Sequence, residues 1–403
     1  DPDSGECVHP PAPGDCDDGD PCTVADACSK SQCIGTPAAC PDAPAWWSCA
    51  IPYRRPLVIG SEPPGEAVAV SLTLDHASLF AAGLSQADGA DLRVVHVAPS
   101  GLVTELDRVL DPDSAWLSAV TRLWFRLHPA GGQYVLYHGQ EAPPAPLEDE
   151  TQVFHFADFF ERADSADVGG GWVETEGAGS ITVHGGALRF AVTADLSNRP
   201  LVDRPFAAPV EGAPEGAEAG PMEWRFGMNW QRTGAETYYR LHLQLGSAAA
   251  MIIPPADDTF PAYGAGVSLV WTGPSQGATH DEGLGWAVGS SITEAAVVSG
   301  PHSIGVTADP ATATYDLAVD GTLVGASLPF SSEVVALDQV RLLSWEISEA
   351  NFAAGRQFDW MLVRRVLSPE PQAGLGPFQS LDQCPATCCA ILEASSLEGT
   401  SAP

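Results

Sequence analysis

The stretch HSIGVTADPATATYDLAVDGTLVGASLPF, at His302–Phe330, decides the fold class. From Ile304 to Ala308 apolar side chains alternate with small or polar ones, and the alternation returns from Tyr315 to Val319. Alternation with a period of two is typical of half-buried strands. Between the second and third runs stands Asp320-Gly321, and glycine tolerates the positive φ of a tight hairpin turn. The stretch therefore predicts antiparallel β-structure.

A second stretch near the end of the fold, GRQFDWMLV at Gly355–Val363, is predicted to partner this hairpin. A hairpin containing V-D-G, followed by G-x-x-F-D-x-x-x-V, resembles the laminin-G or concanavalin-A-like jelly roll. The resemblance covers residues 151–367 and implies a two-sheet sandwich. That fold carries lectins, glycosidases and adhesion modules alike, so it implies no single function.

The region before it, residues 46–146, is a second predicted β-sandwich. Its short alternating runs are bounded by Gly, Pro, Asp or Ser, as in all-β domains. The motifs Tyr53–Ile59, Ala87–Val94 and Tyr137–Gly139 resemble the bacterial domain of unknown function 2341, with His138 where the family usually has tyrosine. In that family the domain often precedes a concanavalin-A-like jelly roll in secreted bacterial proteins, and no catalysis is established. Asp88-Gly89 is expected to form a turn.

The acidic composition limits the kinds of partner that the protein can bind. The 403 residues carry a formal net charge of −34, and such an acidic surface repels nucleic acid and anionic membranes. The charge suits Ca²⁺ binding, although acidity that keeps an extracellular protein soluble is the preferred explanation. No run of ~20 apolar residues predicts a transmembrane segment. The sequence begins Asp-Pro-Asp, which is expected of a processed, secreted chain.

Residues 1–45 form a predicted cysteine-rich module with almost no apolar core, so disulfides are expected to hold it together. Its string from Asp15 to Thr36 resembles the short C-D-D-G-n-P-C modules of secreted bacterial proteins. One interpretation is a calcium loop like the start of an EF-hand, and the alternative is that these residues form turns between disulfides. The predicted calcium ligands are Asp15, Asp17, Asp18, Asp20 and Asp26.

The cysteines, ten in all, stand near the two ends of the chain and indicate an oxidising compartment. Seven lie in the N-terminal region and three in the C-terminal tail, residues 368–403. Because both counts are odd, complete pairing within one chain requires at least one bridge between the two regions; otherwise one cysteine from each is free or pairs with another subunit. The predicted disulfide cysteines are Cys7, Cys16, Cys22, Cys28, Cys33, Cys40, Cys49, Cys384, Cys388 and Cys389.

Catalytic patterns were sought and none was found. The paired carboxylates of a glycosidase, the Gly-x-Ser-x-Gly elbow and the phosphate-binding Gly-rich loop all have no match, so we expect no enzyme. Glycan binding would use exposed aromatic rings, whereas Trp224 and Trp360 are expected to fill the core. The predicted stacking residues are Trp172, Trp230, Trp271 and Trp286.

These observations predict an extracellular, non-enzymatic structural protein, a self-assembling surface or fibre subunit with adhesive character. Its main partner would be itself, through sheet edges and the cysteines of both ends. The alternative is a calcium-assisted, lectin-like glycan-binding module, and a glycoside hydrolase is the remote alternative. Glycan binding with and without calcium distinguishes the first two, and sugar release distinguishes an enzyme from both.

Overall fold

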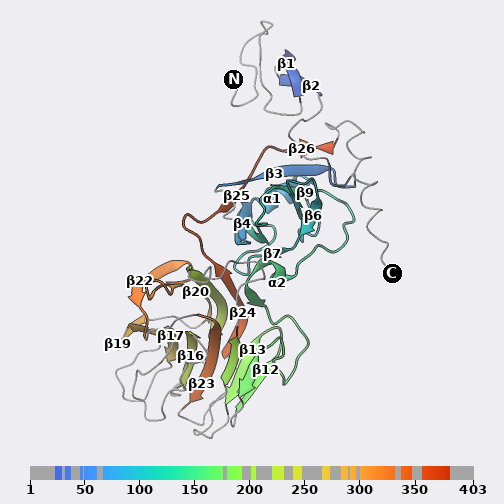
Figure 1. Cartoon of the computed structure of the whole chain (residues 1–403). Coiled ribbons are helices and arrows are strands. Elements are labelled where there is room, and N and C mark those ends of the chain that lie inside the picture. The colour runs from blue at the N-terminus through green and yellow to red at the C-terminus, as the bar shows by residue number, and fades with distance from the viewer. Residues whose placement is uncertain are drawn as a thin grey trace, which may run out of the picture. The chain divides into compact units, whose positions relative to one another are not determined.

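The computed structural model in Figure 1 describes most of the chain, and we confine the description to those parts. The residues described are 23–29, 32–37, 46–48, 50–60, 67–175, 179–192, 201–205, 220–230, 239–246, 266–272, 283–288, 291–295, 300–331, 337–346 and 356–381. The predicted calcium ligands Asp15, Asp17, Asp18 and Asp20 lie outside them, as do eight of the ten cysteines in full.

The chain divides into two compact units, and the first is discontinuous. Unit 1 contains Asp1–Val153 together with Pro369–Pro403, and unit 2 contains Phe154–Ser368. Unit 2 is therefore inserted, in sequence, into unit 1. The proline-rich segment 141–146 belongs to unit 1.

Unit 1 is built on one sheet with the strand order β6-β5-β9-β3-β25-β4-β8-β7, and β26 also pairs with β3. Two short helices accompany it. A separate two-stranded ladder joins the N-terminal strands β1 and β2. The bounds are β1 Thr23–Ser29, β2 Gln32–Pro37, β3 Tyr53–Ile59, β4 Ala69–Leu74, α1 His76–Ala81, β5 Arg93–Val97, β6 Val103–Leu106, β7 Arg108–Leu110, β8 Thr121–Arg126, β9 Gln133–His138, α2 Glu150–Val153, β25 Gln372–Leu375 and β26 Gln379–Ser380.

The C-terminal strands complete this sheet, a role that the sequence did not predict for the tail. β25 pairs antiparallel with β3 and parallel with β4, so it fills the position between them. In Figure 1 the orange-red β25 and β26 lie beside the blue β3. The tail that begins at residue 368 is thus part of a folded domain as far as Leu381, and its later residues, with the three tail cysteines, lie outside the described part.

Unit 2 is an antiparallel sandwich of two sheets. The β15 sheet has the order β12-β13-β24-β15-β20-β21-β22, with β10 also on β24, and the β16 sheet has the order β11-β14-β23-β16-β17-β18-β19. The bounds are β10 Phe156–Asp158, β11 Val173–Thr175, β12 Gly179–Val183, β13 Leu188–Val192, β14 Leu201–Pro205, β15 Met222–Trp230, β16 Tyr239–Gly246, β17 Val267–Thr272, β18 Gly283–Val288, β19 Ser291–Ala295, β20 Gly300–Asp309, β21 Thr314–Val319, β22 Thr322–Pro329, β23 Gln339–Glu346 and β24 Arg356–Arg365.

The predicted hairpin is confirmed as β20-β21-β22. Asp320 and Gly321 have φ of 49° and 74°, the left-handed values that a tight turn between β21 and β22 requires. The predicted partner strand, β24, lies in the same sheet but does not pair with the hairpin, because β15 pairs with β24 on one side and with β20 on the other.

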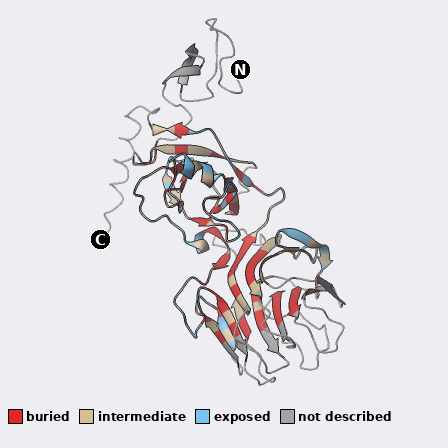
Figure 2. Ribbon diagram, turned by 180° about the vertical axis from the view of Figure 1, so that it is seen from behind, coloured by how far each residue is buried: buried red, intermediate tan, exposed pale blue. Residues whose placement is uncertain are grey.

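One apolar core fills the space between the two sheets. Alternate residues of both sheets face it, among them Phe226 from β15 and Leu243 from β16, both fully buried. Figure 2 shows how much of these strands is buried. The described chain is therefore all-β apart from two short helices, and unit 2 is an antiparallel two-sheet sandwich, as the sequence predicted.

Candidate binding face and buried polar clusters

The outer face of the β16 sheet carries polar side chains. Successive residues of a strand point to opposite faces, and Leu241, Leu243 and Leu245 of β16 face the core. His242 and Gln244 of the same strand therefore face outward. Both are 0% exposed, so the outer face is covered rather than bathed in solvent.

These polar side chains form a row across four strands. Asp203 of β14 pairs in register with Arg341 of β23, Arg341 with Gln244 of β16, and Gln244 with Ser268 of β17. The Arg341 guanidinium donates two hydrogen bonds to Asp203, Nε to Oδ1 at 2.7 Å and an Nη to Oδ2 at 2.8 Å. We call Asp203, His242, Gln244, Ser268 and Arg341 the polar face.

The polar face has the donors and acceptors that a hydroxyl-rich ligand needs. It offers a carboxylate, a guanidinium, an imidazole, an amide and a hydroxyl group. Their order across the sheet is set by strand register, so a rigid scaffold holds them. The polar face was not predicted from the sequence, although the alternation from Arg240 to Leu245 indicates that His242 and Gln244 share one face of their strand.

The predicted stacking tryptophans do not form a surface. Trp271 and Trp286 belong to the core between the sheets and are 2% and 3% exposed. Trp172 is also in that core, and its indole Nε1 donates to Asp158 Oδ2 at 2.9 Å. None of these three rings is therefore available to stack on a sugar. Trp230 ends β15, and its side chain lies outside the described part.

Of the two tryptophans expected in the core, one lies there and the other lies on the outer face of its sheet. Trp224 is in the core, as predicted, at 1% exposed. Trp360 faces outward on the β15 sheet and covers Gly227, where an added Cβ would stand 2.2 Å from the Trp360 Nε1. The Arg225 guanidinium lies 5.5 Å from its ring centroid. Trp360 is 9% exposed, so it is largely covered on that face.

The described residues contain no group of three or more histidine, cysteine, aspartate or glutamate side chains placed to hold a metal ion. The last predicted calcium ligand, Asp26, lies on β1, and its side chain is outside the described part. Calcium binding by Asp15, Asp17, Asp18, Asp20 and Asp26 stays a prediction.

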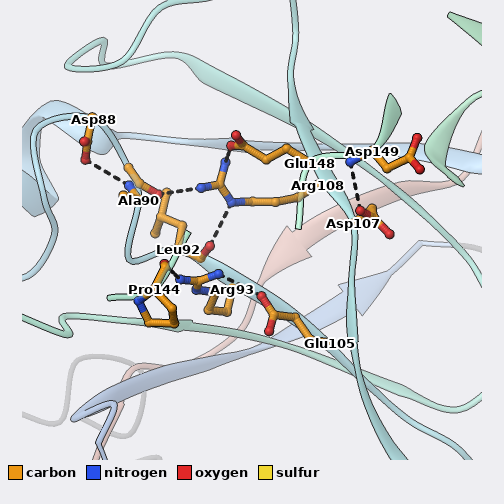
Figure 3. Close-up of polar contacts among 11 residues, drawn as sticks. Asp88, Ala90, Leu92, Arg93, Glu105, Asp107, Arg108, Pro144, Glu148 and Asp149 are labelled. Carbon is orange, nitrogen blue, oxygen red and sulfur yellow. Dashed lines mark hydrogen bonds and ion pairs between the residues drawn. The ribbon is translucent and has the colours of Figure 1, made fainter. Parts of the chain in front are cut away.

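In unit 1, two buried arginines fasten the segment that leads to unit 2 (Figure 3). Arg108 is 1% exposed; it donates from Nε to the Leu92 carbonyl at 2.8 Å and pairs with Glu148 at 3.0 Å. Arg93 pairs with Glu105 at 2.9 Å and donates to the Pro144 carbonyl. The proline-rich segment is therefore held against the domain.

The predicted Asp88-Gly89 turn lies beside the same two arginines. Asp88 Oδ1 accepts the Ala90 amide at 3.0 Å, and Gly89 has a φ of 63°, so the predicted turn is confirmed. The Trp116 ring also packs directly against Gly89, so that a Cβ atom added at this glycine would clash with the ring. Arg93 lies on β5 and pairs with Glu105.

A histidine, a serine and an aspartate also meet in unit 1, but in the wrong order for nucleophilic catalysis. The Ser85 hydroxyl donates to Asp91 Oδ1 at 2.9 Å, and His76 Nε2 lies 3.2 Å from that hydroxyl. In a catalytic triad the histidine stands between the other two and accepts the serine proton. Here the serine hydroxyl donates its hydrogen bond to the carboxylate and not to the histidine, so the cluster does not have the arrangement of a catalytic triad.

Asp91 and the histidines complete this buried network. Asp91, 0% exposed, also accepts the amides of Gln86 and Gly139. His138, also 0% exposed, lies with Nδ1 2.8 Å from the Leu84 carbonyl, and burial lowers its pKa. Burial likewise lowers the pKa of His76. Burial therefore disfavours the charged form of both imidazoles, and the network holds the backbone around Asp91 through its hydrogen bonds.

Of the predicted disulfide cysteines, the described strands place two opposite each other. Cys28 of β1 and Cys33 of β2 are partners in register. The cysteine side chains lie outside the described part, so the pairing of all ten stays a prediction.

Comparison with known proteins gives likenesses of fold only. No family model matches the chain, and no curated protein matches it. Among solved structures, a sialidase is 11% identical with a TM-score of 0.33 over 69% of this chain, and the chain spans 23% of that structure. Peanut lectin is 14% identical with a TM-score of 0.30, covering 48% of this chain and 97% of the lectin. A Lotus tetragonolobus seed lectin is 14% identical with a TM-score of 0.35, covering 55% and 99%.

The resemblance of residues 46–146 to the bacterial domain of unknown function 2341 therefore stays a prediction, as does that of residues 1–45 to secreted cysteine-rich modules. Among the described residues, neither helix has the length or the apolar character to cross a bilayer.

Proposed function

We propose that this protein is a non-enzymatic, extracellular glycan-binding module, and that unit 2 binds its ligand at the polar face. The observation that carries the proposal is the row from Asp203 through Arg341 and Gln244 to Ser268 across four strands. A sugar ring presents hydroxyl groups that both donate and accept hydrogen bonds. A row of carboxylate, guanidinium, amide and hydroxyl groups offers partners of both kinds.

The fold of unit 2 supports this proposal without deciding it, because concanavalin-A-like sandwiches carry several functions. Two of the solved structures that it resembles are lectins by name. Extracellular location rests on the cysteine content and the acidic composition. Glycan binding at the polar face requires that His242 and Gln244, both 0% exposed, become accessible to the ligand.

A glycan array with the whole protein, with and without Ca²⁺ and chelator, tests the proposal. We expect retention of a related set of oligosaccharides, and loss of that retention in Gln244→Ala. Gln357→Ala is the matched control, because Gln357 is on β24 in the other sheet, where its Nε2 donates to Asp359 Oδ1 at 2.7 Å. Equal loss in both variants, or no retained glycan under any condition, contradicts the proposal.

Assay for released sugar separates binding from hydrolysis. Because the histidine, serine and aspartate of unit 1 have an order unsuited to catalysis, and because no paired carboxylates are evident in the sequence, we expect no reducing ends above the buffer level. Turnover of a glycan that the array identifies would replace the binding proposal by a hydrolase.

Self-assembly is a second candidate function, favoured by the β22 edge of the β15 sheet. β22 is the last strand of its sheet and its sequence TLVGASLP has no charge. Leu323 on it is 58% exposed. Uncharged edge strands are ready to pair with another chain, although the positive φ of 50° at Ser327 disturbs this one.

Particle size, by light scattering and negative-stain imaging, tests this second candidate. Regular particles that disappear in Leu323→Lys and persist in Leu102→Lys would establish pairing through β22; Leu102, in unit 1, is 67% exposed. A particle of the 42.1 kDa chain mass under all conditions, with and without reductant or chelator, would leave glycan binding alone.

A further inference from the structure

The end of the described chain runs along β3 in a fixed register. Gln379 of β26 is opposite Arg54, and Ser380 is opposite Tyr53. The Leu381 amide continues the pattern by donating to the Pro52 carbonyl at 2.8 Å. In the sequence, Cys49 precedes the first residue of β3 by four positions, and Cys384 follows the last residue of β26 by four positions.

The side chains around this point bring the same two segments together. Arg54 Nε donates to Gln379 Oε1 at 2.7 Å, and both residues are buried. Leu381 packs against a buried apolar cluster that includes Trp46 and Ile51. The two segments are thus held by side-chain packing as well as by their backbones.

Cys49 stands between two described residues, Ser48 and Ala50. The Ile51 amide donates to the Ser48 carbonyl at 3.2 Å, and the Ala50 amide donates to Ser48 Oγ at 3.3 Å. Chain connectivity places the Cys49 Cα about 3.8 Å from those of both neighbours. Cys384 follows Leu381 by three residues, a reach of about 10 Å at most. A disulfide requires the two Cα atoms to be about 5.5 Å apart, which this reach allows.

We propose that Cys49 and Cys384 form an intrachain disulfide that locks the C-terminal strands to β3. The bridge satisfies the parity of the cysteines, because it removes one from the seven of the N-terminal region and leaves six there. It also closes a loop of 335 residues (384 − 49) that contains the whole of unit 2. Its effect is to hold β25 in place between β3 and β4.

The chemistry is a two-electron oxidation by a disulfide oxidant, such as a thiol–disulfide oxidoreductase or oxidised glutathione. The thiolate of one cysteine attacks the oxidant disulfide and releases one of its sulfurs as a thiolate. The second cysteine, also as thiolate, attacks the mixed disulfide, forms the Cys49–Cys384 bond and releases the other sulfur. The two protein thiols lose two protons and two electrons, and the oxidant becomes two thiols.

Peptide mapping of the unreduced, full-length protein tests the bridge directly. Cleavage before aspartate and after arginine releases residues 42–54, which contain Cys49 alone, and residues 382–403, which contain Cys384, Cys388 and Cys389. We expect these peptides to be linked and to separate on reduction. Free thiols at Cys49 and Cys384 in protein purified without reductant would overturn the proposal, as would a link between two chains, seen as a covalent dimer on a non-reducing gel.

Two matched variants identify the tail cysteine. The linked peptide should persist in the double variant Cys388→Ser/Cys389→Ser and disappear in Cys384→Ser. The opposite result assigns the bridge to Cys388 or Cys389 and overturns the proposal. The wild-type map does not depend on either variant folding.

Hydrogen exchange measures what the bridge does. In Cys49→Ser/Cys384→Ser we expect the amides of residues 373–375 to exchange at least about tenfold faster, since the unlinked strand separates from β3 more often. The control Cys28→Ser/Cys33→Ser changes the N-terminal strands and should leave those amides unchanged. Equal acceleration in both variants would assign the effect to the N-terminal region and contradict the lock.

Discussion

The two units differ in how completely they bury charged side chains. Unit 2 packs two sheets around one apolar core, in which Phe226 and Leu243 are fully buried. Both units bury polar groups, but unit 1 buries charged ones more completely: Asp91, Arg93 and Arg108 are 0–2% exposed, whereas the buried charged residues described in unit 2 are 6–9% exposed. Apolar packing spreads the stabilisation over many weak contacts, whereas a buried charge depends on a few partners and is costly when one of them is lost.

The units also differ in how the chain builds them. Unit 2 is made from one continuous stretch, Phe154–Ser368, whereas unit 1 needs β25 from the far end of the chain to join β3 with β4. A sheet that lacks its middle strand is divided into two parts. Unit 1 is therefore expected to be sensitive at a few positions, and unit 2 to tolerate more changes.

The largest expected effect is at the middle strand. Ala373→Asp places a carboxylate at an 8% exposed position of β25, where no cation is described to pair with it. We expect unit 1 to unfold while the unit 2 transition stays within about 0.5 kcal/mol, because the change is outside that unit. Calorimetry resolves the two transitions. Gln372→Asp, at an exposed neighbouring position, is the control, and similar unfolding there would contradict the argument.

A large-to-small substitution in the core of unit 2 is expected to destabilise that unit alone. Leu243→Ala should lower the free energy of unfolding of unit 2 by about 2–5 kcal/mol, through lost transfer energy and a cavity, without affecting unit 1. Denaturant titration followed by tryptophan fluorescence measures it. The control substitution Leu323→Ala, at an exposed residue, should lower the free energy of unfolding of unit 2 by less than about 0.5 kcal/mol. A single shared transition that moves with both units would show that they unfold together.

Acid should act on unit 1 through its buried histidines. Burial lowers the pKa of His76, His96 and His138, so each binds a proton more readily when unfolded. Their contribution to stability is present above the unfolded pKa, about 6.5, and is lost as the pH falls below it. Melting curves between pH 8 and pH 5 should show the unit 1 transition falling. The substitution His138→Gln should reduce the pH dependence of the unit 1 transition. The control His184→Gln, at an exposed histidine, should leave that pH dependence unchanged. The reverse result would contradict the role of the buried histidines.

The smallest expected effect is at the rim of the arginine cluster. Glu105→Gln keeps the shape of the Arg93 partner and removes its charge, in a pair with side-chain exposures of 3% and 21%. A loss of about 1 kcal/mol is expected, since hydrogen bonding remains. Arg93→Gln, which also abandons the Pro144 carbonyl, should cost more. If the two substitutions cost the same, the guanidinium does not hold the Pro144 segment.

Much of unit 2 could be predicted because its signals are local. The alternation of apolar and polar residues predicted the strands of the hairpin, and Asp320-Gly321 predicted the turn between two of them. Strand pairing is not local, and so the insertion of β15 between the hairpin and β24 was missed. β25 has four residues, Gln372–Leu375, without a clear period, and its partners β3 and β4 are about three hundred residues away in the chain.

The candidate sites were harder to predict for another reason. Tryptophan serves both cores and sugar sites, and only the strand face decides between them. Val267, Leu269 and Trp271 have the same parity on β17, so this pattern could have assigned Trp271 to the core. Buried arginines give no such sign, because arginine is usually exposed and its burial depends on distant carbonyl groups.

The register of β26 with β3 also determines how the protein would respond to force. Tyr53 and Ser380 are opposite each other, so a pull on the segments beyond them would act at one end of the ladder. Hydrogen bonds loaded in this way break one after another, as in a zipper, and resist weakly. After β26 and β25 are peeled away, tension reaches Phe156 and Val363, which are again paired in register. The chain would then lengthen in steps, and a Cys49–Cys384 disulfide would carry the tension past both ladders and keep them closed.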